Sequence, residues 1–315
     1  WGYPFELTLL EGQYAQPLIE SFSNFDGPMF LGKTMLKELP AFIDFVVGSR
    51  EGSKPRWALG LDWSGFDSSV SPGLISIAFK VLISNLELTS HQEEEMRVIE
   101  WYFTKTPLAL PNGEVYVKFG GVPSGSFFTN IIDSIVNFIV ILYLQLKTFG
   151  YKKLPDGSSV HEEKWVRFKT YGDDSVMPIP DGERVDLRTW SQLAQETFGM
   201  LLNVDKSAFA CKPEHLEFLG HKSMNGKVLR EDSKLLRLAL YPEYPVSDPG
   251  ESVSRVLGYL VDSGYRSWPM IRLYNSMVSK YGHPKGEPNR FELYVLQQSI
   301  PKGRLSGDWK IASWA

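Results

Sequence analysis

The sequence predicts an α+β fold in which strands and helices follow one another without a regular repeat. Three observations carry this prediction. Apolar residues recur with helical spacing in several segments, shorter segments alternate between apolar and polar residues as strands do, and no regular strand-helix-strand alternation links the two kinds. With 315 residues, 43% of them hydrophobic, the chain is long enough to bury a large core in one or two domains.

In the first half of the chain, one strand is expected before a series of helices. Residues 1–55 mix short apolar runs with turn residues, whereas residues 56–62 (RWALGLD) alternate like a strand. Residues 112–113 (NG) favour the tight turn of a hairpin. The apolar spacing predicts helices at 73–86, 92–102 and 125–146.

The second half is expected to contain two hairpins and further helices. Residues 164–171 and 175–179 have the pattern of two strands joined by a turn at 172–174. A helix is predicted at 187–198, and a second hairpin follows Gly220. The last predicted helices lie near 250–263, 268–281 and 289–299.

The composition excludes several classes of protein. Aromatic residues make up 13% of the chain, which excludes a disordered or low-complexity protein. The single cysteine, Cys211, excludes an internal disulfide framework and indicates a reducing compartment. The longest candidate membrane span, residues 127–146, is interrupted by polar side chains, so no membrane segment is predicted.

Two aspartates flank a turn at the end of the first predicted strand. Residues 62–67 read DWSGFD, and Asp62 shares one strand face with Ala58 and Gly60. Because these neighbours are small, a bulky group could approach Asp62. Taken alone, the pattern fits an exposed Asp62 and a helix N-cap at Asp67 at least as well.

A second acidic signal lies in residues 171–174 (YGDD). Two adjacent carboxylates at the tip of a hairpin repel each other unless a cation is present. An ordinary Gly-Asp turn is the alternative. Together with Asp62, the pair Asp173 and Asp174 would supply three carboxylates at strand ends, a set able to hold two metal ions about 3.5–4 Å apart.

A glycine-rich segment followed by a polar helix stripe is the third signal. Residues 120–126 (GGVPSGS) offer backbone N–H groups at the start of a helix, where a phosphate is readily bound. Thr129, Asp133 and Asn137 are spaced by four and form one polar stripe on an otherwise apolar helix. Such a stripe faces either a cleft or hydrogen-bonding partners in the core.

In this order, the three segments resemble motifs A, B and C of viral RNA-dependent RNA polymerases, above all those of partitiviruses and related double-stranded RNA viruses. Residues 121–137 (GVPSGSFFTNIIDSIVN) carry the most characteristic wording. Residues 191–207, which end in NVDKS, are similar to motif D, and residues 217–220 (EFLG) are similar to motif E. The resemblance covers about residues 56–222.

The resemblance implies a right-hand polymerase fold with an antiparallel palm sheet, partial fingers and a helical thumb. The implied division is 1–55 partial fingers, 56–84 palm, 85–119 fingers insertion, 120–222 palm and 223–315 thumb. Residues 1–5 (WGYPF) resemble the stretch just after a basic motif F, and no copy of that motif lies in residues 1–55. The chain is therefore expected to begin just downstream of it.

The implied activity is template-directed RNA synthesis by nucleotidyl transfer, with release of pyrophosphate. The family implies two Mg²⁺ ions, replaceable by Mn²⁺, with Asp62 and Asp173 as the main ligands and Asp174 assisting. The implied partners are RNA template and product, nucleoside triphosphates and a viral coat protein. The implied location is the host cytoplasm, inside the virus particle.

The family also implies roles around the nucleotide. Asp67 would lie near the ribose, Ser124 and Gly125 would touch template or nucleotide, Thr129 would lie at the ribose site, and Lys206 would donate a proton to pyrophosphate.

The sequence departs from the family at one of these positions. Many relatives have Asn four residues after the threonine of motif B; here that residue is Asp133, and Asn137 follows one turn later. Either Asp133 or Asn137 could therefore help Asp67 to read the sugar.

The formal net charge of −4 is unexpected for an RNA-binding chain, and absent fingers would supply the missing positive charge. A local basic run precedes motif C, and a solvated surface explains it more simply than RNA contact does. It consists of Lys147, Lys152, Lys153, Lys164, Arg167 and Lys169.

Three alternative interpretations are less consistent with the sequence than a polymerase is. Residues 27–34 (GPMFLGKT) match the P-loop spacing, but the preceding residues are mostly polar and do not form the apolar strand that a P-loop follows. Cys211, His215 and His221 are too few and too irregularly spaced for a zinc site. A reverse transcriptase would share the acidic pair, but the wording of residues 124–129 is of the RNA-virus type.

Overall fold

The computed structural model describes residues 3–49, 55–150, 152–153, 159–160, 168–180, 182–242, 245–246 and 248–283. The chain divides into two compact units. The larger comprises Trp1–Lys33 and Phe42–Gly220, and the smaller comprises Thr34–Ala41 and His221–Ala315. The assignment of fingers, palm and thumb boundaries within them stays a prediction.

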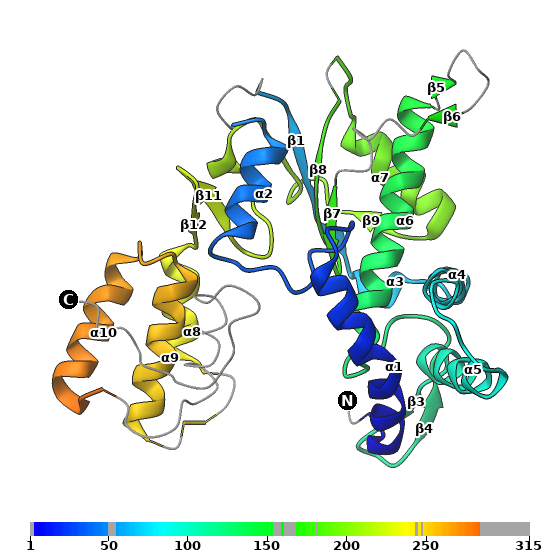
Figure 1. Ribbon diagram of the computed structural model, residues 1–315, viewed down its shortest axis with the longest axis horizontal. Helices are drawn as coiled ribbons and strands as arrows, with labels where there is room; N and C mark the ends of the chain where they lie inside the picture. Colours follow the sequence, from blue (N-terminus) through cyan, green and yellow to red (C-terminus); the bar gives the residue numbers. More distant parts are fainter. Residues whose placement is uncertain are drawn as a thin grey trace. The chain divides into compact units, whose positions relative to one another are not determined.

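A four-stranded antiparallel sheet lies in the larger unit (Figure 1). In spatial order, its strands are β10 (Ala208–Ala210), β1 (Ala58–Leu61), β8 (Asp174–Pro178) and β7 (Lys169–Tyr171). Short pairs join β2 (Trp63–Ser64) to β9 (Leu201–Leu202), β3 (Pro107–Ala109) to β4 (Val115–Val117), and β5 (Lys152–Lys153) to β6 (Ser159–Val160).

Three helices of the larger unit begin at a capping side chain. Ser71 caps α4, and Thr89 forms a capping box with Gln92 at the start of α5. Asp186 caps α7, which ends at Gly199 in the left-handed conformation. The helices are α1 (Phe5–Asn24), α3 (Phe66–Ser69), α4 (Pro72–Ile83), α5 (Ser90–Thr104), α6 (Thr129–Phe149) and α7 (Leu187–Phe198). Helix α2 (Glu38–Val46) begins in the smaller unit and ends in the larger.

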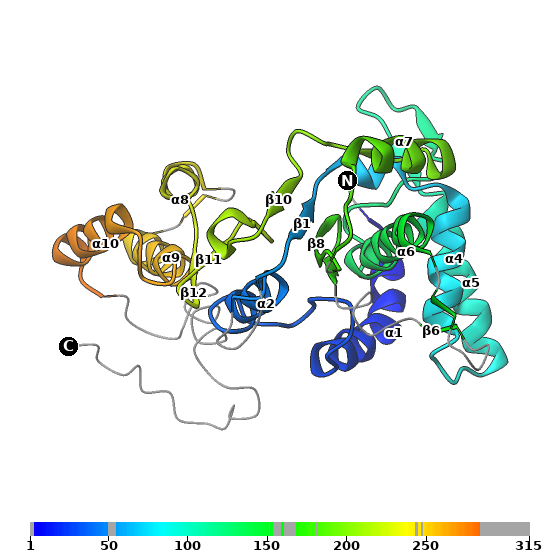
Figure 2. The ribbon, with the colours of Figure 1, turned by 90° about the horizontal axis from the view of Figure 1, so that it is seen from above.

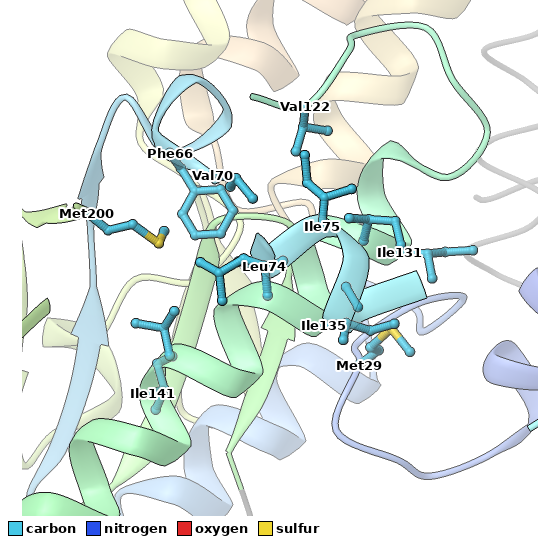
Figure 3. Packing of buried hydrophobic residues seen from close by; sticks show 14 of the residues in the cluster. Met29, Phe66, Val70, Leu74, Ile75, Val122, Ile131, Ile135, Ile141 and Met200 are labelled. Carbon is cyan, nitrogen blue, oxygen red and sulfur yellow. The ribbon is translucent and has the colours of Figure 1, made fainter. Parts of the chain in front are cut away.

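Helix α6 organises the core of the larger unit. It packs against β7 and contacts α4 and α7 (Figure 2). Figure 3 shows Phe66 and Leu74 packed in one cluster with Ile131 and Ile141 of α6. Among the described residues, α6 alone is long and apolar enough to cross a membrane, but 61% of its most apolar window is buried inside the protein, as in a core helix.

The smaller unit has a core of its own. A hairpin of β11 (Lys222–Met224) and β12 (Lys227–Leu229) turns at Asn225-Gly226, where both residues have positive φ, 51° and 70°. Three helices follow: α8 (Asp232–Leu240), α9 (Pro249–Asp262) and α10 (Trp268–Tyr281). Leu235, Leu260 and Met270 form their shared core.

Most predicted elements are present, and the structure adds short elements that the sequence did not predict, among them α3, β2, β5, β6, β9 and β10. No helix was predicted within residues 1–55, where the structure has α1 and α2. Helix α8 was not predicted either. Helix α6 begins at Thr129 rather than at 125, because Gly125 has a φ of 104° and cannot belong to a right-handed helix. The predicted helix at 289–299 and residues 164–167 lie outside the described residues.

Candidate catalytic site

The sheet register places Asp62 opposite Asp174. Leu61 pairs with Ser175, so the next position along the same register brings Asp62 across from Asp174. The backbone of Asp62 is held from the other side as well. Its N–H donates to Ser207 Oγ at 3.1 Å, and its carbonyl accepts from the N–H of Asn203 at 2.8 Å. The predicted motif D segment therefore fixes the backbone of Asp62.

The space beside Gly60, on the strand face that it shares with Asp62, is occupied by another segment of the chain. A Cβ at Gly60 would lie 3.3 Å from the carbonyl oxygen of Glu217 and 3.4 Å from Leu216 Cδ1. The small residues on this face of β1 therefore admit the chain's own segment at 216–217. The space beside Gly60 is thus filled by the chain itself, and the expected approach of a bulky group to Asp62 stays a prediction.

Asp173 lies in a two-residue turn between β7 and β8. Gly172 has a φ of 60°, which the first position of a type II′ turn requires. Helix α6 holds this turn, because Ser134 Oγ accepts from the N–H of Gly172 at 2.8 Å and the carbonyl of Ser134 accepts from Thr170 Oγ1 at 3.0 Å.

Asn137 joins the two acidic segments. Its Nδ2 donates to the carbonyls of Gly172 at 3.0 Å and Asp173 at 2.7 Å, and its Oδ1 accepts from Trp63 Nε1 at 3.0 Å. Asn137 is fully buried, with 0% of its surface exposed. Trp63 directly follows Asp62, so one side chain ties the end of β1 to the turn that carries Asp173.

Burial and neighbouring negative charges raise the pKa of two carboxylates at this position, Asp174 and Asp173. Burial raises the pKa of Asp174 to about 6, and the charges of Asp173, Glu217 and Asp62 add to the effect. Burial, followed by the charge of Asp67, also raises the pKa of Asp173. The predicted acidic residues therefore lie within electrostatic reach of one another.

These carboxylates lie near one another but do not form a complete metal-coordination site by themselves. In the part of the chain that the structure describes, no three His, Cys, Asp or Glu side chains come close enough to hold an ion by themselves. Mg²⁺ usually takes only one or two protein carboxylates and completes its shell with water and substrate phosphates. An oxygen-only, acidic and partly open donor set fits that ion.

Asp133 is the most strongly perturbed group of the site. Only 4% of its surface is exposed, and its Oδ1 has no hydrogen-bond partner among the described residues. Burial, together with the charges of Asp67 and Asp173, raises its pKa to about 8. The two residues of the predicted polar stripe therefore have different surroundings. Asp133 lies near the acidic residues Asp67 and Asp173, whereas Asn137 is hydrogen-bonded to the backbone and to Trp63.

The glycine-rich segment forms a loop that is fastened next to Asp67. Gly121 N–H donates to the carbonyl of Val70 at 2.7 Å, and Val122 N–H donates to the carbonyl of Asp67 at 2.8 Å. Asp67 itself is exposed in α3.

The tip of this loop is open to solvent, with Ser124 and Gly125 exposed. Thr129, half-buried, donates its hydroxyl to the carbonyl of Pro123 at 2.6 Å. Lys206 is also exposed, in the turn between β9 and β10, and its N–H donates to Asn203 Oδ1 at 3.3 Å.

Residues of the P-loop-like segment, the histidines and the basic run have structural contacts. Within residues 27–34, backbone bonds between Pro28, Phe30 and Thr170 align the segment beside β7, so it is not a phosphate cradle. His221 is paired with Asp262 at 2.9 Å. In the basic run, Lys169 Nζ binds Asp26 Oδ1 at 2.6 Å; Lys164 and Arg167 lie outside the described residues.

Sequence reasoning missed two acidic residues near these segments. Glu217 was noted only as part of motif E, and its charge reaches Asp174. Glu11 is buried against the loop that follows Val122, through Ser126. A signal for Glu11 exists in the sequence, because it shares a helical face with Leu7, Tyr14 and Leu18.

The antiparallel sheet, the helix braced behind its acidic turn and the gathered carboxylates define a protein of the right-hand polymerase class. Residues 1–281 match the model of a protein family described as "Viral RNA-dependent RNA polymerase". The chain therefore belongs to this family. The sequence-based resemblance is thereby confirmed, and the family favours an RNA polymerase over a reverse transcriptase or a P-loop enzyme.

Known proteins similar to this chain come from several RNA viruses. The RNA-directed RNA polymerase of Cryptosporidium parvum virus 1 (strain KSU-1) is 30% identical over 179 residues, 54% of this chain and 32% of that protein. The RNA-directed RNA polymerase of Atkinsonella hypoxylon virus (isolate 2H) is 30% identical over 206 residues, 64% of this chain and 28% of that protein.

A solved structure supports the fold. The crystal structure of the RNA-dependent RNA polymerase of a human picobirnavirus has a TM-score of 0.69 at 18% identity, covering 88% of this chain and 52% of that one. The chain thus spans about a third of the curated relatives and about half of the solved polymerase.

Proposed function

We propose that this chain carries the catalytic centre of an enzyme that copies an RNA template into RNA. The reaction is attack of a primer or nucleotide 3′-hydroxyl on the α-phosphate of a nucleoside triphosphate, with release of pyrophosphate. The observation that carries the proposal is the register that sets Asp62 opposite Asp174, with Asp173 in the adjoining turn. Positioning and charge neutralisation are the protein's main tasks in such chemistry.

The family generally uses divalent metal ions, and the acidic donor set suits them. In the proposed enzyme, Asp62 and Asp173 are the main ligands and Asp174 assists. Two Mg²⁺ ions, or Mn²⁺ in their place, supply activation of the attacking hydroxyl and stabilisation of charge on the leaving group. The raised pKa values of Asp173 and Asp174 support this role, because carboxylates that repel one another are stabilised by a cation.

Primer extension tests the proposal most directly. The protein at its natural full length should extend a primer on an RNA template with ribonucleotides, and only when a divalent metal is present. Preferred use of deoxyribonucleotides would point to a reverse transcriptase, and ATP hydrolysis without extension would point to a P-loop enzyme. RNA template, RNA product and nucleoside triphosphates are the proposed partners.

A viral coat protein as a further partner, and the interior of the virus particle in the host cytoplasm as the location, complete the proposal. Both rest on family membership alone.

The proposal assigns sugar recognition to Asp67 and Asp133. Asp133 lies within electrostatic reach of Asp67 and has an unpaired buried oxygen. Burial is the main reason why its pKa is raised to about 8, and this favours the protonated form, which can donate a hydrogen bond. Asn137 is less suited, since its amide is already bonded to Trp63 and to the backbone. Thr129 remains at the proposed ribose site, and Ser124 and Gly125 at the proposed template contact.

Asp67→Ala is expected to relax discrimination between ribo- and deoxyribonucleotides by about tenfold or more, because a site built to bond a hydroxyl rejects analogues that lack it. Asp133→Ala should have the same effect. The measurement is the ratio of kcat/KM for the two nucleotides. Unchanged ratios in both variants would contradict this assignment.

Lys206→Ala is expected to slow the chemical step by about 10²-fold, since a positioned general acid contributes roughly 10²–10⁴-fold. Nucleotide binding should change little. Rapid-quench single-turnover kinetics separate the two. Lys212, another exposed lysine, supplies the matched control variant Lys212→Ala. An unchanged maximal rate in Lys206→Ala would make Lys206 an ordinary surface lysine.

A further inference from the structure

Glu11 is a buried carboxylate that lies outside all the motifs of the proposed site. It belongs to α1, and 0% of its surface is exposed. No cation pairs with it in the described part of the chain. A buried carboxylate without a cation is costly unless hydrogen bonds replace water around both oxygens. Glu11 therefore has to be explained by the groups that it binds.

Three donors surround this carboxylate. Ser126 Oγ lies 2.9 Å from each of the two oxygens, the N–H of Phe127 donates to Oε2 at 2.9 Å, and the hydroxyl of Tyr3 donates to Oε1 at 2.7 Å. Burial raises the pKa of Glu11, and these hydrogen bonds act in the opposite direction. Hydrogen bonds to a charged acceptor are about twice as strong as neutral ones.

One of the three donors, Ser126, is the last residue of the glycine-rich loop, and a second, Phe127, directly follows it. Ser126 also accepts from the N–H of Phe128 at 3.0 Å, so Glu11 orders the last residues before α6. The other end of the loop is fastened independently by the bonds from Gly121 to Val70 and from Val122 to Asp67. The exposed tip, Ser124-Gly125, thus lies between two fixed ends. One end is hydrogen-bonded beside Asp67, and the other is hydrogen-bonded to Glu11.

Tyr3 connects Glu11 to the tip of the loop as well. A Cβ at Gly125 would lie 3.5 Å from Tyr3 Cβ, so the residue whose hydroxyl donates to Glu11 also lies beside the tip. Gly125 has a φ of 104°, a conformation that requires support from its surroundings when a loop is to hold one shape.

We infer that Glu11 is a positioning residue that fixes the glycine-rich loop for nucleic acid or nucleotide binding, acting through Ser126, Phe127 and Tyr3. The inference rests on the proposed function, which places template or nucleotide at Ser124-Gly125. Loss of the anchor frees one end of the loop while the contacts of Asp62 and Asp173 stay in place. Binding is therefore affected more than chemistry, and KM rises while kcat changes little.

The test compares Glu11→Ala and Glu11→Gln with Glu20→Gln, which changes an exposed glutamate of the same helix. Two quantities are measured on the protein at its natural full length. The hydrogen-exchange rate of the peptide that contains the Phe127 amide shows whether the hydrogen bond from Phe127 to Glu11 is present, and it does not depend on enzyme activity. Steady-state primer extension gives KM and kcat for the incoming nucleotide.

We expect exchange in Glu11→Ala to be about tenfold faster or more at Phe127, and KM to rise by a similar factor with kcat within about twofold. Glu11→Gln keeps one carbonyl acceptor and should fall between wild type and Glu11→Ala, which preserves the test if Glu11→Ala does not fold. Glu20→Gln should match the wild type in both measurements.

Each contrary result has a distinct meaning. Unchanged exchange at Phe127 in a folded Glu11 variant overturns the anchor. Faster exchange with unchanged KM, or an equal loss of kcat, overturns its positioning role. Absence of extension by the wild type would contradict the proposed function instead, and the exchange result would still decide whether Glu11 fixes the loop.

Discussion

Asp173→Asn and Asp62→Asn are each expected to reduce RNA synthesis on the order of 10³-fold or more while the protein still folds. Asparagine keeps the size of the side chain and removes the negative charge on which metal binding depends. A metal ion contributes several kcal/mol to stabilisation of the transition state, and about 4 kcal/mol corresponds to 10³-fold in rate. The effect should appear in kcat of primer extension across a titration of Mg²⁺.

The fold should survive these substitutions for a structural reason. Asn137 holds the turn through the backbone carbonyls of Gly172 and Asp173, and the backbone of Asp62 is held by Ser207 and Asn203. Neither set of bonds uses the carboxylate that is replaced. Removing one of several mutually repelling charges should leave the thermal midpoint equal or higher.

Asp232→Asn is a suitable control, because it makes the same chemical change at an exposed position in the smaller unit. It should extend primers like the wild type. If Asp62→Asn or Asp173→Asn were to extend primers at a near-normal rate, the assignment of these two residues as metal ligands would be wrong.

The catalytic segments could be predicted because their signals are local. The strand pattern of residues 56–62 contains β1, which ends one residue before Asp62, and Gly172 marks the turn that carries Asp173. Helix α7 was predicted with its observed bounds, since Asp186 and Gly199 cap it at either end. Such features depend on neighbours in sequence, which a single chain displays.

The contacts that set the site could not be predicted in the same way. Asn137 lies on a polar stripe that the sequence reveals, but its partners are 74 residues away at Trp63 and 35 residues away at Gly172. Glu11 and Ser126 are 115 residues apart. Helical spacing shows that such a side chain is buried, and only the tertiary structure shows what it binds.

Helix α1 was missed for a more specific reason. Pro17 lies inside it, and proline usually marks the end of a helix. The apolar positions Leu7, Tyr14 and Leu18 nevertheless continue across Pro17 on one face, and Tyr14 and Leu18 are buried in the core. Tertiary packing there outweighs the local cost of one missing backbone bond.

Asn137→Ala is expected to lower the free energy of unfolding by about 3 kcal/mol and to slow extension by folded protein about 10²-fold. The substitution leaves Trp63 Nε1 and the carbonyls of Gly172 and Asp173 without their buried partner, and each unpaired buried group costs about 1–3 kcal/mol. The turn of Asp173 and the end of β1 would then move independently, and a displacement of about 1 Å can cost 10²-fold in rate.

Gln145→Ala supplies the matched control on the same helix. Gln145 is a buried amide, 2% exposed, whose Nε2 lies 3.6 Å from Met177 Sδ and which the structure does not link to either acidic segment. Urea unfolding should show destabilisation in both variants, whereas kcat per folded molecule should fall only in Asn137→Ala. The ratio of ribo- to deoxyribonucleotide use should stay unchanged in Asn137→Ala, because its amide is committed to the protein. A changed ratio with unchanged stability would instead make Asn137 the residue that reads the sugar, and Asp133 would lose that role.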